Sequence, residues 1–209
     1  ILMLGEHAQK NEVNTKSVLY PKTKKKKFTV PFDAPSFLLN NFTVSLFNKL
    51  YFNLSKNNQT SYVNWDTYFY PLDSIGEWNR MYGKRGFFQF QCLLPSKLSK
   101  KGYTKILSTI QKKSSGSFLA VLKYFGSGNG HFSFPKEGFS LALDFKASKK
   151  NIKVGKELSD IVNDFGGSFY LAKDAILNDY QFKPNLNEDE FLKHRNISIN
   201  SEQSNRLKL

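Results

Sequence analysis

Polar side chains alternate with apolar ones in three segments that are predicted to be β-strands, residues 86–94, 118–125 and 138–145. Because successive side chains of a strand point to opposite faces of a sheet, polar residues of one parity share a face. The residues expected on this face are Gln89, Gln91, Lys123, Ser140 and Asp144. Amide groups are costly to bury without partners. We therefore expect the face to meet either bulk water, as in an ordinary two-layer domain, or a polar ligand.

The elements that would carry this face follow a regular order along the chain. Period-two patterns predict strands at 86–94, 118–125, 138–145 and 168–171, and apolar residues at i, i+3, i+4 and i+7 predict helices over 96–113 and 151–165. The order strand, helix, strand, strand, helix, strand is typical of a ferredoxin-like unit, in which both helices cover one face of an antiparallel sheet. We therefore predict an α+β fold with helices on one face and an open second face.

The opposite parity and the upstream part of the chain give further packing predictions. In segment 118–125 the side that faces the helices should carry Phe118, Ala120, Leu122 and Tyr124. Upstream, the patterns predict a strand at 1–4, a helix over 43–54, a strand at 62–70 and a helical turn at 74–82. Trp78, in this last turn, is expected to anchor the core.

Thiol and imidazole chemistry has little support in the sequence. Cys92 is the single cysteine, which excludes an internal disulfide and a cysteine-built metal site. Its apolar neighbours predict a buried, unreactive thiol. The histidines His7, His131 and His194 stand far apart without the spacing of metal ligands. We therefore assign no metal.

A glycine-rich segment at 126–130 would let backbone N–H groups approach an anion. It joins two predicted strands, leads into no helix and lacks the Lys-Ser/Thr ending of a phosphate-binding P-loop. A flexible hairpin connection is therefore the favoured interpretation.

The chain carries a net charge of +14, from 31 Lys and Arg against 17 Asp and Glu, with its densest basic run at 22–27. Such a charge favours polyanionic partners, so a binding module for an anionic polymer is one alternative. The run is short and has no interleaved aromatic residues, which favours a solvated loop and argues against nucleic acid. No apolar run approaches the roughly 18 residues that cross a bilayer. With no targeting segment, we expect a cytoplasmic location or one peripheral to the inner membrane.

Several segments together resemble one family of flavoproteins. They are Phe32-Asp-Ala-Pro35, Tyr70-Pro-Leu-Asp73, Glu77-Trp-Asn-Arg80 with Tyr82-Gly83, Gly86-Phe-Phe-Gln-Phe-Gln91, Phe118 to Gly126, Leu141 to Phe145 and Phe165 to Asp174. Over residues 28–175 these segments occur in the same order as the matching segments of the oxidase subunits of decaprenylphosphoryl-ribose 2′-epimerase. Those subunits are vanillyl-alcohol-oxidase-like flavoproteins. The joint occurrence of the segments is far more specific than any one segment.

The resemblance implies a two-domain enzyme, with one domain that holds FAD and a cap domain whose antiparallel sheet binds the sugar. The substrate, a lipid-linked or small sugar, would be oxidised by hydride transfer to the flavin, and a partner reductase would act on the keto product. By the same resemblance, residues 1–167 are the cap domain without its first part. Residues 168–209 would return to an FAD-binding domain that this chain lacks. We therefore expect the chain alone neither to hold flavin tightly nor to oxidise a substrate.

The resemblance also implies roles for individual residues. Gln89 and Gln91 resemble the paired glutamines of the substrate pocket, and Lys123 resembles its substrate-contacting lysine. Lys173 resembles the lysine beside the flavin that is needed for activity, and Tyr170 falls on the cofactor side.

Three positions depart from the mycobacterial pattern. Ser140 stands where that pattern has an asparagine and Phe69 where it has a tyrosine, both on the substrate side. On the cofactor side, Ala142 replaces a cysteine. These losses of polar contacts leave a related polyol or lactone oxidase as an alternative. A separate alternative is a non-catalytic cap-like domain that assembles with a partner chain.

Overall fold

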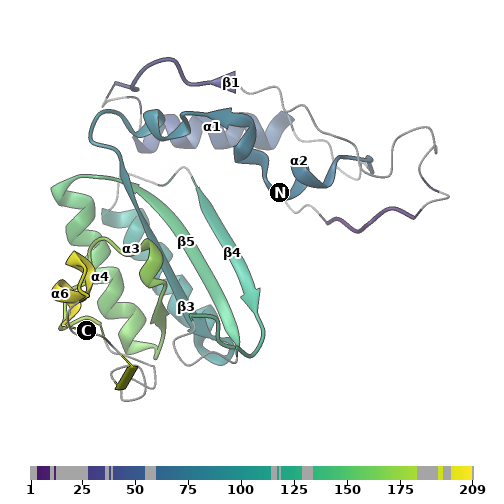
Figure 1. Ribbon diagram of the computed structural model, residues 1–209. Helices are drawn as coiled ribbons and strands as arrows, with labels where there is room; N and C mark the ends of the chain where they lie inside the picture. The colour runs from purple at the N-terminus through teal and green to yellow at the C-terminus, as the bar shows by residue number, and fades with distance from the viewer. Residues whose placement is uncertain are drawn as a thin grey trace.

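A four-stranded sheet with two long helices against it forms the packed part of the protein (Figure 1). The computed structural model describes residues 4–9, 12, 28–35, 38, 40–54, 60–113, 117, 119–128, 134–182, 193–194 and 199–208. The packed part contains β3 (Phe87–Pro95), α3 (Ser96–Lys113), β4 (Ala120–Phe125), β5 (Gly138–Lys146), α4 (Lys149–Asp164) and β6 (Ser168–Phe169). A 3-10 helix, η3 (Leu171–Lys173), and the C-terminal helix α6 (Glu202–Leu207) follow.

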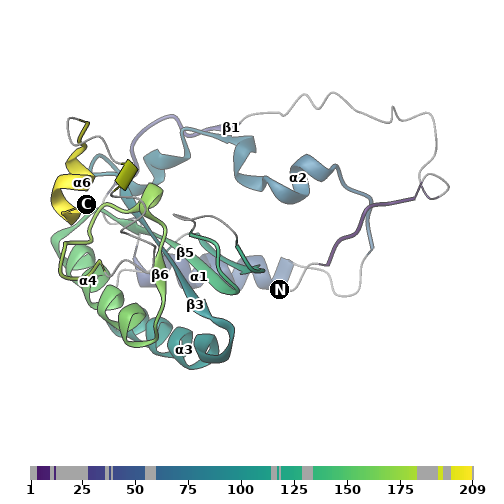
Figure 2. The same cartoon turned by 60° about the horizontal axis from the view of Figure 1, so that its bottom comes forward.

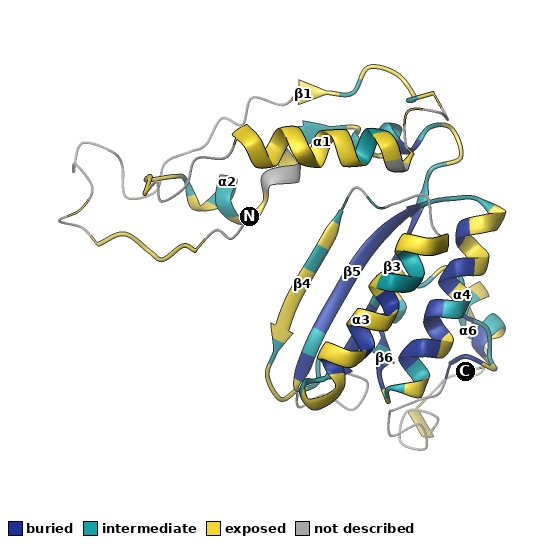
Figure 3. Ribbon diagram, turned by 180° about the vertical axis from the view of Figure 1, so that it is seen from behind, coloured by how far each residue is buried: buried dark blue, intermediate teal, exposed yellow. Residues whose placement is uncertain are grey.

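The strand order confirms the predicted α+β, ferredoxin-like arrangement. The sheet runs β4-β5-β3-β6, and every neighbouring pair is antiparallel. Helices α3 and α4 lie side by side over one face of β3 and β5 (Figure 3). The other face of these central strands is not covered by either helix. Helix α4 begins two residues before its predicted start, because the Ser148 side chain accepts a hydrogen bond from the Asn151 N–H and caps the helix.

The core lies between the sheet and the two helices. Its strand residues include Phe88, Phe90, Cys92, Leu94, Leu141, Leu143 and Phe145, and its helix residues include Ile106, Val154, Leu158, Ile161 and Val162. These are the residues that the alternation of the strands and the spacing of the helices predict for the core. Their burial on one face of each strand leaves the other face for polar groups. Cys92 is fully buried as predicted, and burial raises the pKa of its thiol to about 12.

Two glycines shape the turn that leads from α4 into β6. Gly166 has a φ of 65°, in the left-handed region that favours glycine. A Cβ atom on Gly167 would lie 2.6 Å from the Leu93 carbonyl oxygen. This close approach lets β6 pair with β3, with Phe169 opposite Cys92.

Strand β4 is less covered than predicted. Leu122 and Tyr124 were assigned to the side under the helices, yet both side chains are 59% exposed, and Ala120 is exposed as well. The reason is that α3 and α4 lie over β3 and β5, so the edge strand extends beyond them (Figure 3). Phe118 lies outside the described residues, as do residues 1–3, the basic run at 22–27, His131 and the end of segment 126–130.

The upstream part contains α1 (Asn41–Leu54), α2 (Trp65–Phe69), the 3-10 helices η1 (Pro71–Ser74) and η2 (Trp78–Tyr82), and a parallel pair of β1 (Phe28–Thr29) with β2 (Ile75–Gly76). The predicted helix over 43–54 is confirmed. The predicted strand at 62–70 is wrong, because Asn64 caps a short helix there by accepting a hydrogen bond from the Asp66 N–H. Trp78 is only half-buried, and the buried residue of this segment is Tyr82, whose ring stacks on Phe87.

We predict that Leu158→Ala lowers the free energy of unfolding by about 2–5 kcal/mol, because it removes a fully buried side chain and leaves a cavity. Leu107→Ala is the control, since Leu107 is 50% exposed on the neighbouring helix. Its cost should stay below about 1 kcal/mol. Urea unfolding followed by circular dichroism measures both, and equal losses would contradict the two-layer packing.

Candidate functional site

The structure brings the predicted polar residues of β3 and β5 together on the uncovered face of the sheet. Gln89 is directly opposite Asp144 in the strand pairing, and its Nε2 donates a hydrogen bond of 2.6 Å to Asp144 Oδ1. Gln91 Nε2 donates a hydrogen bond of 3.1 Å to Ser140 Oγ. Ser140 and Asp144 are buried, whereas both glutamines are half-buried. We call Gln89, Gln91, Lys123, Ser140 and Asp144 the polar face.

Asp144 is the most unusual group of the polar face, because its side chain is fully buried. Burial raises the pKa of its carboxyl group above the ordinary value, while the Gln89 hydrogen bond, the charge of Lys173 and the Tyr82 hydroxyl oppose this rise. Burial, and next the charge of Asp144, raise the pKa of Tyr82. The carboxyl group is therefore held among an amide, a phenol and an ammonium group from separate parts of the chain.

Lys123 lies at the β4 side of the polar face. It is directly opposite Ser140 in the pairing of β4 with β5, so that both side chains belong to the same face, as predicted. Its side chain is exposed, whereas Ser140 is 1% exposed. An exposed ammonium group beside half-buried amides is suited to the charged end of a polar ligand.

The turn after β6 brings Tyr170 and Lys173 to the other side of the polar face. The Tyr170 N–H donates to the Gln91 carbonyl oxygen at 3.1 Å, which continues the pairing beyond β6. Lys173 Nζ lies 6.0 Å from the centre of the Tyr170 ring, and its charge acts on Asp144. The Tyr170 ring also packs on Phe134 with a centroid distance of 5.0 Å. An aromatic ring and a cation thus flank the amides.

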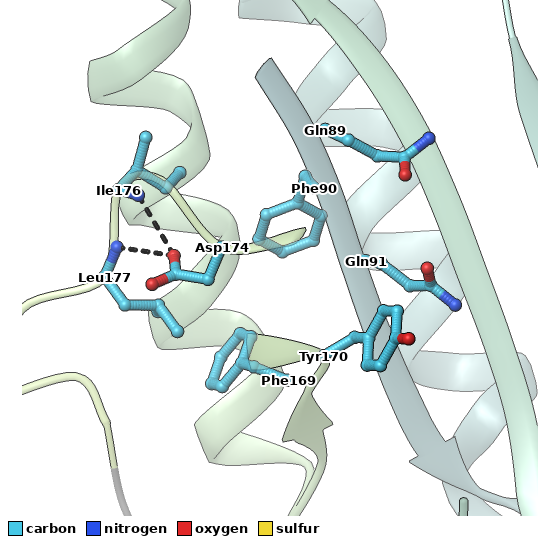
Figure 4. A pocket seen from close by; sticks show the side chains of 8 residues that line it. All are labelled: Gln89, Phe90, Gln91, Phe169, Tyr170, Asp174, Ile176 and Leu177. Carbon is cyan, nitrogen blue, oxygen red and sulfur yellow. Dashed lines mark hydrogen bonds between the residues drawn. The ribbon is translucent and has the colours of Figure 1, made fainter. Parts of the chain in front are cut away.

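A small pocket lies where β3 meets this turn (Figure 4). Its lining residues are Gln89, Phe90, Gln91, Phe169, Tyr170, Asp174, Ile176 and Leu177. In Figure 4 the Gln89 and Gln91 side chains point the same way from β3, with Tyr170 beside Gln91. Ala142, opposite Gln91 on β5, is 8% exposed and contributes only a methyl group to the middle of the face.

Phe69 is not brought to the polar face. It is 58% exposed at the end of α2 and packs edge-to-face on Tyr68. Helix α2 lies away from the four-stranded sheet in two views (Figures 1 and 2). The substrate-side role of Phe69 therefore stays a prediction.

Sequence reasoning missed two polar residues that bear on the site. Tyr82 precedes β3, and its position beside Asp144 depends on the stacking of its ring on Phe87. Asp174 follows Lys173, but its partner Arg206 comes 32 residues later, and no local pattern joins the two. Within the described ranges, no three His, Cys, Asp or Glu side chains gather as a metal site.

Comparison with known proteins finds a clear relative of this chain. No family model matches the chain. Over 148 residues it is 36% identical to decaprenylphosphoryl-beta-D-ribose oxidase of Mycolicibacterium smegmatis (strain ATCC 700084 / mc(2)155), and the match covers 70% of this chain. Over this stretch the chain is a relative of the decaprenylphosphoryl-ribose oxidases.

The match covers 32% of the mycobacterial oxidase, so the chain spans about a third of that relative's length. The match agrees with the resemblance of the short segments. Among the described helices, none combines the length and apolar character that crossing a membrane would require.

We predict that Asp144→Asn changes how stability depends on pH. Asparagine keeps an oxygen that accepts from Gln89 but removes a charge that burial disfavours. Since the carboxyl pKa is raised in the folded protein, the wild type loses stability as pH rises from the unfolded pKa, about 3.9, through the folded value. The free energy of unfolding of the variant should therefore rise relative to that of the wild type across this pH interval. The difference should persist at higher pH.

Urea unfolding at a series of pH values from acid to neutral measures this difference. Asp164→Asn is the matched control, because its side chain is 65% exposed and pairs with Lys105 at the surface. A stability difference between Asp144→Asn and wild type that does not change with pH would contradict the assignment.

Proposed function

We propose that this chain is the substrate-side part of an FAD-dependent oxidoreductase that oxidises a sugar alcohol, the 2′-hydroxyl of a polyprenyl-phosphoryl pentose. The observation that carries the proposal is the polar face itself. Amide, hydroxyl and ammonium groups line the uncovered side of the sheet, with Lys173 beside them, in a chain related to a decaprenylphosphoryl-ribose oxidase. The name of the mycobacterial relative supports the choice of a lipid-linked ribose.

The residues present fit a flavin on this face. Ala142 offers a methyl group where a larger side chain would fill the middle of the face, and the Tyr170 ring gives an aromatic surface beside it. Ala142 and Tyr170 are therefore the residues that would contact the cofactor. A bound flavin would supply the hydride acceptor, which no side chain provides. The domain that holds most of the FAD would lie outside this chain.

The two glutamines are arranged to bind sugar hydroxyls. An amide NH₂ group has two N–H donors, and each glutamine uses one of them, on Asp144 or on Ser140. Among the residues that the structure describes, each glutamine therefore keeps one N–H and a carbonyl oxygen for a ligand. An ionised Asp144 carboxylate can only accept hydrogen bonds, so the Gln89 amide must turn its NH₂ group toward Asp144. The carbonyl oxygen of Gln89 then points away from this contact.

Lys173 is the residue that we propose acts on the reacting hydroxyl group. Its ammonium group donates hydrogen bonds and would stabilise the negative charge that develops on the substrate oxygen as the hydroxyl proton is lost to water, ahead of hydride loss from the carbon atom. Lys123, exposed at the opposite side of the polar face, would contact the phosphate-bearing part of the substrate. Ser140 holds the Gln91 amide in place.

The surroundings of the enzyme follow from this chemistry. A net charge of +14 suits a lipid phosphate at an anionic membrane surface, which supports a cytoplasmic or inner-membrane-peripheral location. A partner reductase would convert the 2′-keto product to the epimer.

We predict that Lys173→Ala, made in the complete protein, lowers kcat by about 100-fold or more without loss of bound flavin, because charge stabilisation at the reacting oxygen is lost. Substrate-dependent flavin bleaching under anaerobic conditions measures the step directly. Lys149→Ala, at the start of α4 on the covered side of the sheet, is the matched control and should keep full activity. Turnover of Lys173→Ala within a few-fold of wild type would remove this assignment.

A further inference from the structure

The turn that carries Lys173 makes few hydrogen bonds to the sheet. Strand β6 pairs with β3 over only two residues, and the Tyr170 N–H adds one more bond, to the Gln91 carbonyl oxygen. The turn then closes on itself through Lys173 N–H to Tyr170 O at 3.0 Å and Asp174 N–H to Leu171 O at 3.1 Å. These bonds define its shape, and apart from the packing of Leu171 against the core they do not fix it to the rest of the protein.

Asp174 is the point at which the turn is fastened. Its side chain is only 5% exposed, and Oδ1 accepts hydrogen bonds from the N–H groups of Ile176 and Leu177 at 3.0 and 2.9 Å. Figure 4 shows the carboxylate directed at these two backbone groups. Oδ2 accepts from Arg206 Nη2 at 2.9 Å. A carboxylate this well supplied with donors is held in one orientation.

Helix α6 supplies the other half of this fastening. Arg206 also donates from Nη1 to the Leu177 carbonyl oxygen, and Gln203 Nε2 donates to the Leu171 carbonyl oxygen at 2.7 Å. The helix is anchored in turn, because Leu207 is 3% exposed within the core. Helix α6 thus holds residues 171–177 at both ends, on the side away from the polar face.

We propose that α6 is a latch for the turn that carries Lys173, with Arg206 and Gln203 as positioning residues that act through Asp174 and Leu171. This inference rests on the proposed role of Lys173. The physical reason is that a flexible cation must be held in a narrow range of positions to act on one hydroxyl group. Neutralisation by Arg206 also keeps the Asp174 carboxylate from competing for the adjacent ammonium group.

The first test uses this chain alone and needs no flavin. In Arg206→Ala, amide hydrogen exchange at Lys173 and Asp174 should quicken by about tenfold or more, while exchange in α4 stays unchanged, because only the turn is released. Lys208→Ala is the matched control, since Lys208 caps the C-terminal end of the same helix but pairs with Asp179 at the surface. Gln203→Leu is the second variant, because it removes the Leu171 contact without leaving a buried charge.

The second test uses the complete flavin-loaded protein. Arg206→Ala and Gln203→Leu should lower kcat by about tenfold with KM little changed. Arg206→Lys should restore part of the rate, since lysine keeps the charge but lacks the two-pronged geometry. Lys208→Ala should match wild type.

Three results would overturn the latch. One is unchanged exchange at Lys173 and Asp174 in both variants, and another is faster exchange throughout α4, which indicates general destabilisation. The third is faster exchange at Lys173 and Asp174 in Arg206→Ala and Gln203→Leu with wild-type kcat in both, while Lys173→Ala still abolishes turnover. If Lys173→Ala instead keeps full activity, the proposed function fails, and the exchange data still report whether α6 holds the turn.

Discussion

The pairing of β3 with β5 is the constraint on which the site depends. It places Gln89 opposite Asp144 and Gln91 opposite Ala142, so that polar residues of one parity meet on one face. The other parity supplies Phe88, Phe90 and their partners to the core beneath α3 and α4. A shift of one residue in this pairing would exchange the two faces and bury both amides among apolar side chains.

The polar face is completed by groups that the sheet does not itself carry. Tyr82 reaches Asp144 from before β3, and Lys173 approaches from the turn after β6. Neither position follows from strand parity. Tyr82 depends on the stacking of its ring on Phe87 at the start of β3, and Lys173 depends on the docking of α6. The face therefore combines a rigid layer of amides with a cation whose position is set by the C-terminal helix.

The alternation of side chains along the strands predicts which residues share the polar face. The periodicity of the helices predicts which residues enter the core. The sequence pattern fails where tertiary contacts decide the outcome. Leu122 and Tyr124 have the parity of covered residues, yet they are exposed because α3 and α4 lie over β3 and β5 and leave the edge strand β4 less covered. The segment at 62–70 alternates like a strand, but the Asn64 cap and local hydrogen bonds favour a helix. The pairing of Asp174 with Arg206 joins segments with no common pattern, so only the structure reveals it.

The central claim is that the uncovered side of the sheet binds the substrate. Labelling of two adjacent residues on β4, one on each side of the sheet, tests this claim. Lys123 and Leu122 are both exposed but point to opposite sides, and Cys92 is fully buried. Lys123→Cys and Leu122→Cys in the complete protein are alkylated with a maleimide, and the rate at each site is followed by mass spectrometry. A short-chain prenylphosphoryl ribose at ten times its Kd should slow labelling at position 123 by about tenfold and leave position 122 unchanged. Equal rates at position 123 with and without this ligand, or protection at position 122, would contradict the account.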